Sequence, residues 1–129
     1  KHGFRVREEW IVDCQFDQST AMQKAMELKR RYPGIDAFFC ASDGIAIGAI
    51  DGMMQLGMQV PQDVAVAGFD DFTVSKYIHG GITSVKQYPY EMGVACANTV
   101  VSMIDGNRVP DWIPMEYKLM KRTSTKAKL

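Results

Sequence analysis

Cysteine and histidine are scarce in this sequence, with three and two copies among 129 residues. The cysteines Cys14, Cys40 and Cys96 are odd in number, far apart and set among apolar neighbours. This pattern is typical of buried thiols in a reducing compartment and argues against disulfides and zinc. His2 and His79 have no cysteine or acid at ligand spacing, so we expect no metal site.

The sequence also lacks an excess of charge of either sign, since 15 basic residues balance 15 acidic ones. It therefore creates no general field that would attract nucleic acid or an anionic membrane. We interpret the basic end "YKLMKRTSTKAKL" as a solvated strand end and tail. No apolar run approaches the ~20 residues of a membrane span, and "KHGFRVREEW" has no apolar core of a signal peptide. We expect a cytoplasmic protein without membrane contact.

Hydrophobic residues alternate between strand-like and helix-like spacing along the first half of the chain. A short strand is expected near 11–14, followed by a helix that Asp17 or Ser19 caps and that ends near Arg31. "DAFFCA" is expected to be a second strand. Ser42 or Asp43 caps a helix that Gly57 terminates, and "VAVAGF" is the next strand.

The second half continues the alternation with a short helix over 74–79, a strand "ITSVKQ", a helix from Pro89 to about 104, and a half-exposed strand in "WIPMEYKLMKR". Strands without polar alternation are covered on both faces, and such alternation with helices implies a parallel sheet. The predicted fold class is α/β, with a parallel sheet flanked by helices. The nine methionines are expected to fill the core, with a subunit interface as the alternative for Met53, Met54 and Met58.

Polar or aromatic residues follow three of the predicted strands. They are Phe16 with Asp17, Ser42 with Asp43, and Asp70 with Asp71. In parallel α/β sheets ligands bind at the carboxyl ends of the strands, so these residues define a candidate site. An aromatic face beside a carboxylate suits a sugar or a nucleoside. Simpler interpretations stay open: Asp43 as a helix cap, Phe16 as a core residue, and the acid pair as one cap and one solvated side chain.

Catalytic chemistry is not indicated by the motifs present. A divalent metal held by Asp70 and Asp71 would need a third carboxylate and usually a lysine, and none stands at a matching strand end. The sequence has no G-x-S-x-G elbow and no phosphate-binding glycine loop. We therefore expect no enzymatic activity, no catalytic residues and no cofactor, and keep a metal-dependent enzyme only as a third alternative.

Several ordered motifs resemble the lactose-repressor (LacI/GalR) family of transcriptional regulators. "IDAFFCASDGIAIGAIDGMMQLGMQVPQDVAVAGFDD" is similar to its signature region, an apolar strand, "A-N-D", a small-residue helix and "G-x-x-V-P-x-D-V-x-V-x-G-F-D-D". "ITSVKQYPYEMG" resembles "L-T-T-V-x-Q-x-x-x-x-M-G", and "IPMEYKLMKRTST" resembles "L-P-x-x-L-V-x-R-x-S-T". The resemblance spans essentially the whole chain.

The resemblance implies a two-lobed effector domain of the type I periplasmic-binding-protein-like fold, which closes on a small molecule, usually a sugar or a purine. Phe16 would stack on the ligand and Asp70 would accept its hydrogen bonds. Ser42 stands where the family commonly has a ligand-contacting Asn, and Gln87 ends a strand that crosses between the lobes. Asp43 matches an acid that we expect to be structural.

By the same resemblance, 1–87 would belong to the C-terminal lobe, 88–111 would be a helix of the N-terminal lobe, 112–123 a returning strand and 124–129 a flexible tail. The chain would start within the C-terminal lobe, so DNA would be bound only through a helix-turn-helix outside it, by a homodimeric repressor. We expect no specific DNA binding, and weak or no ligand binding, by the chain alone. The alternative function is the sugar-binding protein of an ABC importer.

Overall fold

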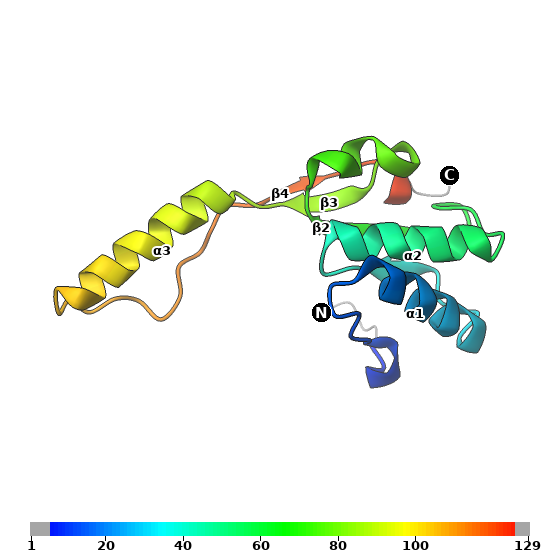
Figure 1. Ribbon diagram of the computed structural model, residues 1–129, viewed down its shortest axis with the longest axis horizontal. Coiled ribbons are helices and arrows are strands. Elements are labelled where there is room, and N and C mark those ends of the chain that lie inside the picture. The colour runs from blue at the N-terminus through cyan, green and yellow to red at the C-terminus, as the bar shows by residue number, and fades with distance from the viewer. Residues whose placement is uncertain (1–5, 126–129) are drawn as a thin grey trace.

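The computed structural model describes residues 6–125 of the chain (Figure 1). The helices are α1 (Gln18–Arg31), α2 (Asp43–Gln55) and α3 (Pro89–Ile104), and the strands are β1 (Ala37–Phe39), β2 (Ala65–Asp70), β3 (Thr83–Lys86) and β4 (Lys118–Met120). Short 3-10 helices are η1 (Glu8–Trp10), η2 (Thr73–Lys76), η3 (Ile78–Gly80) and η4 (Thr123–Thr125). The alternation of helices and strands confirms the α/β class.

The four strands form one sheet in the order β1-β2-β3-β4. β1, β2 and β3 are parallel, with Phe38 opposite Val66 and Gly68 opposite Ser84. β4 returns antiparallel to β3. The carboxyl ends of the three parallel strands therefore lie at one edge, as the candidate site requires.

Helix α2 provides more of the buried core than any other element, because its small residues allow close packing on both sides. Ala46, Ile50 and Met53 are buried with Val66 of β2. On its other side α2 packs against α1, where a Cβ on Gly48 would lie 2.2 Å from the carbonyl oxygen of Gln18. Met53 is thus core filler rather than an interface residue.

Two sequence predictions about strands are wrong. No strand forms at 11–14, where Ile11 is 72% exposed, because no neighbouring strand among the described residues supplies hydrogen-bond partners. β1 was expected to be covered on both faces, yet only Phe38 packs on the core while Phe39 is 73% exposed. The expected helix over 74–79 is two 3-10 turns, η2 and η3.

Helix α3 projects away from the sheet, and the chain returns along it to β4 (Figure 1). Pro89 begins the helix and Gly106 follows it with φ +76°, as expected from the sequence. None of its residues is buried. Cys96 is consequently exposed, which corrects the expectation of three buried thiols, whereas Cys14 and Cys40 are buried and all three are free.

The end of the chain is more ordered than expected where it is described. Ser124 is 2% exposed, and its hydroxyl donates to the carbonyl of Val66 at 2.6 Å and accepts from the amide of Thr83 at 2.8 Å. Of the expected tail 124–129, residues 126–129 lie outside the described residues. No helix between residues 6 and 125 is long and apolar enough to cross a bilayer.

Candidate functional site

Asp70 and Gln87 meet at the carboxyl edge of the sheet. Asp70 ends β2 and Gln87 follows β3, and the Gln87 side-chain amide donates to the Asp70 carboxylate at 2.7 Å. Both line a cavity of about 520 Å³ that opens between this edge and the start of α3. The remaining lining residues are Asp71, Phe72, Thr73, Lys86, Pro89 and Met92. Polar groups on an apolar wall of this size are typical of a small-molecule site.

The backbone at Asp70 and Asp71 is strained. Their φ angles are +98° and +55°, a region that L-residues rarely adopt. Such residues cost about 1–3 kcal/mol each and persist only where their surroundings hold them, often at binding sites. Two consecutive strained residues therefore mark the loop after β2 as a candidate functional segment.

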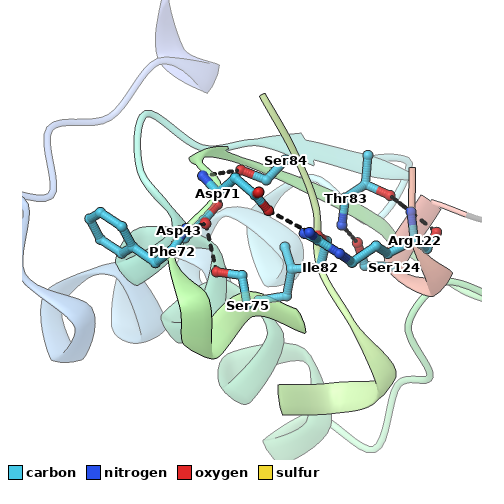
Figure 2. Close-up of polar contacts among 9 residues, drawn as sticks. All are labelled: Asp43, Asp71, Phe72, Ser75, Ile82, Thr83, Ser84, Arg122 and Ser124. Carbon is cyan, nitrogen blue, oxygen red and sulfur yellow. Dashed lines mark hydrogen bonds and ion pairs between the residues drawn. The ribbon is translucent and has the colours of Figure 1, made fainter. Parts of the chain in front are cut away.

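A buried carboxylate, Asp43, lies behind this loop (Figure 2). It is fully buried and accepts hydrogen bonds from the backbone N–H of Phe72 at 2.8 Å and from the hydroxyls of Ser75 at 2.5 Å and Ser84 at 2.6 Å. These donors satisfy a charge that would otherwise be costly to bury. The sequence-based interpretation of Asp43 as a structural acid is supported by these contacts, whereas the helix cap itself is Ser42.

Asp71, in the same loop, is held by an ion pair with Arg122. Its carboxylate pairs with the guanidinium of Arg122, and both side chains are largely shielded from solvent. Arg122 also donates to the carbonyl of Ile82 at 2.7 Å, which fixes it beside β3 (Figure 2). Both acids line the cavity, but the Asp71 carboxylate is engaged by Arg122, so Asp70 is the stronger candidate for a ligand contact.

Ser42 and Phe16 are not among the residues that line this cavity. The Ser42 hydroxyl accepts from the N–H of Ile45 at 3.2 Å and is 8% exposed, so its visible role is to cap α2. Phe16 precedes the start of α1 with φ +52° and is 75% exposed, which rules out the alternative of a core residue. The roles of Phe16 and Ser42 as ligand contacts stay predictions.

Sequence reasoning missed the partners of the neighbouring Asp71. The Arg122–Asp71 pair joins positions 51 residues apart, and Ser84 acts through a hydroxyl in the middle of a strand. Lys86 and Met92, which line the cavity, were also overlooked. The sequence did offer one signal. The expected strand "ITSVKQ" contains polar residues, whereas a strand inside an α/β sheet is usually apolar throughout.

Metal chemistry finds no support in the described part of the chain, where no three His, Cys, Asp or Glu residues are grouped to hold an ion. The two buried thiols do not suit nucleophilic chemistry either. Burial, with smaller effects from Cys14 and Asp43, raises the pKa of the Cys40 thiol to about 12, and burial raises the pKa of Cys14. A raised thiol pKa leaves little nucleophilic thiolate at neutral pH.

An α/β sheet with an apolar-walled cavity at its carboxyl edge, into which a few polar groups project, is the arrangement typical of small-molecule-binding domains. Residues 1–125 match the family described as the periplasmic binding protein-like domain. The chain belongs to this family, and the resemblance to LacI-type regulators read from the sequence is confirmed by its relatives.

Three of those relatives indicate the extent of the similarity. The HTH-type transcriptional regulator MalR of Clostridium butyricum is 29% identical over 124 residues, which are 96% of this chain and 37% of MalR. The transcriptional regulator CelR in complex with cellobiose has a TM-score of 0.84 at 34% identity, covering 95% of this chain and 38% of CelR. A sugar-binding LacI-family regulator from Escherichia coli, complexed with phosphate, has a TM-score of 0.79 at 28% identity over 95% of this chain and 44% of its own.

The chain thus spans well under half the length of the regulators that it matches. The relatives are named as transcriptional regulators and not as enzymes.

Proposed function

We propose that this chain is the effector-sensing part of a LacI-type transcriptional regulator, and that its effector is a sugar or a nucleoside. The observation that carries the proposal is the Asp70–Gln87 pair, which lines a cavity at the carboxyl edge of the sheet. The chain that contains this pair aligns with transcriptional regulators along nearly its whole length. The similarity to a regulator complexed with cellobiose supports the sugar alternative.

In this proposal each site residue has a distinct role. The half-buried Asp70 carboxylate accepts hydrogen bonds from ligand hydroxyls or ring N–H groups, and Gln87 orients it while offering a further amide contact. Phe16 stacks on the ligand, and Ser42 contacts it where relatives commonly carry an amide. Apolar side chains such as Met92 line the cavity beside these groups.

The proposed division into lobes assigns 1–87 to the C-terminal lobe and α3 to the N-terminal lobe, with the segment after it returning to the sheet. The absence of any buried residue in α3 supports this, since a helix with Val100, Val101 and Ile104 more than half exposed lacks the partner that its apolar residues need. The second wall of the ligand cleft would come from the same N-terminal lobe.

The partners follow from the same proposal. A homodimer in the cytoplasm would bind DNA through a helix-turn-helix that belongs to the longer regulator, and this chain would contribute neither DNA contacts nor catalysis. Its effector would change DNA affinity by binding between the lobes.

The test is a thermal-shift screen of the protein encoded by the complete reading frame that contains this sequence. Mono- and disaccharides and nucleosides are compared between the wild type and Asp70→Ala. At least one compound should raise the melting temperature of the wild type, because it binds only the folded state, and should raise that of the variant by less. No response to any compound, or an equal response of the variant, would contradict the proposal.

The alternative of an importer's sugar-binding protein is separated by the start of the same reading frame. A helix-turn-helix supports the regulator, whereas an export signal supports the importer.

A further inference from the structure

We propose that Asp43 is a positioning residue of the binding site, which acts through the loop after β2 to hold the Asp70 carboxylate against Gln87. The inference rests on the proposed function only in taking Asp70 as a ligand contact. Asp43 itself is fully buried and does not line the cavity.

Backbone N–H groups of the strained loop are connected to the Asp43 carboxylate by hydrogen bonds. After Asp70, the N–H of Asp71 donates to the Ser84 hydroxyl at 3.0 Å, and that hydroxyl donates onward to Asp43 Oδ1 at 2.6 Å. The N–H of Phe72 donates directly to Asp43 Oδ2 at 2.8 Å. The backbone that follows the two positive-φ residues, Asp70 and Asp71, is thus held by the Asp43 carboxylate, and both of its oxygens accept hydrogen bonds in this network.

Strand β2 is shaped to receive this carboxylate. A Cβ on Gly68 would lie 2.3 Å from Asp43 Oδ1 and 3.2 Å from the Cβ of Ala46, so only glycine leaves room at this position. Gly68 has an ordinary strand conformation and is not needed for a turn. Gly68 lies two residues before Asp70, and its missing side chain leaves the space that the Asp43 carboxylate occupies.

Capping of α2 does not explain the buried acid. The Ser42 side chain already accepts from the N–H of Ile45 at the start of that helix. The Asp43 carboxylate instead points to the loop between β2 and η2 (Figure 2). This leaves the loop, and through it Asp70, as the feature that Asp43 organises.

Two buried serines offer a matched pair for the test, since both are fully buried and both donate to Asp43. Only Ser84 also accepts from the backbone of Asp71. The measurement is the side-chain amide resonance of Gln87 in ¹H–¹⁵N spectra of the 129-residue chain, which reports its bond to Asp70. Asp43→Asn and Ser84→Ala should move this resonance toward its position in Asp70→Ala, whereas Ser75→Ala should leave it in place.

Loss of stability alone is controlled by Leu28→Ala, which removes a buried side chain of α1 outside this network. It should lower the melting temperature and leave the Gln87 resonance unchanged. An unmoved Gln87 resonance in Asp43→Asn and Ser84→Ala, despite lower melting temperatures, would show that Asp43 only stabilises the fold and would overturn the inference. If Asp43→Asn does not fold, the comparison of Ser84→Ala with Ser75→Ala decides.

Gly68→Ala adds an independent arm, because it displaces the carboxylate without removing its charge. It should reproduce the Gln87 shift of Asp43→Asn, and an unmoved resonance would contradict the inference. None of these spectra requires a ligand. If the Gln87 resonance moves as expected but the ligand screen fails, the proposed function is refuted and the positioning role of Asp43 stands. If the screen succeeds but the resonance does not move, only the positioning role is refuted.

Discussion

Asp70 combines a strained backbone with a carboxylate that has spare hydrogen-bonding capacity. Within residues 6–125 only Gln87 donates to this carboxylate, although its two oxygens offer about four acceptor positions. A ligand with several hydroxyl or N–H donors would use the remaining positions. Strain at this residue is therefore consistent with selection for binding rather than for stability.

The first prediction concerns the two residues expected to contact the ligand. Phe16→Ala and Asp70→Ala, in the protein from the complete reading frame, should each weaken effector binding by about 1–3 kcal/mol through lost stacking area or an unpaired ligand donor. Calorimetric titration with a compound found in the screen measures both. Unchanged affinity in both variants would show that the site lies elsewhere.

Replacing Asp70 by glycine separates strain from binding. Glycine adopts φ near +98° freely, which recovers about 1–3 kcal/mol of strain against about 0.5–1 kcal/mol of added chain entropy. Asp70→Gly should therefore resist urea better than Asp70→Ala by about 1 kcal/mol, although both lack the carboxylate and bind equally poorly. Equal stability of the two variants would mean that the residue is not strained.

Cys40 predicts a pH dependence of stability. Its pKa rises from 9.0 to about 12 on folding because the thiol is buried, so between these values the folded chain keeps a proton that the unfolded chain has lost. Stability should consequently fall as the pH rises above 9. Urea titrations across this range should give a shallower decline for Cys40→Ala, and parallel declines would contradict the assignment.

At the scale of elements, α2 connects the core to the site. Its small residues let α1 approach on one side, while its first turn carries Asp43 to the loop after β2. Gly48→Ala should destabilise the chain by about 1–3 kcal/mol, because the new Cβ would meet backbone of α1 that cannot move aside. Chemical denaturation measures the loss. Gly44→Ala, in the same helix with its nearest contact at 3.7 Å, is the control and should cost less.

The elements themselves were largely predictable, since α1, α2 and α3 follow helical spacing and have recognisable ends at Asp17, Ser42, Gly57 and Gly106. The strand at 11–14 was not, because a strand depends on neighbours that the local sequence does not reveal. In the site, the strand-end pattern located Asp70, whereas Gln87 was identified only through the family resemblance. The network around Asp43 escaped prediction because its residues join four separate segments, and side-chain bonds across such separations leave no local pattern.

At the scale of the whole molecule, the described chain has a packed body and a projecting arm formed by α3 and its return segment (Figure 1). Isolated helices of this length are marginal in water, and α3 has no buried residue to hold it. Native-state hydrogen exchange should show much weaker protection in α3 than in α2. Comparable protection in a monomeric sample would contradict the proposed assignment of this helix to another lobe.

The most direct test of the binding site is an NMR titration of the protein from the complete reading frame, with a compound identified by its thermal shift. The account predicts that the Gln87 side-chain amide and the backbone amides of Asp70 and Asp71 shift together with a single dissociation constant. Asp70→Ala should raise the ligand concentration needed for these shifts in line with its loss of about 1–3 kcal/mol in affinity. Saturable binding that leaves these resonances unmoved would contradict it.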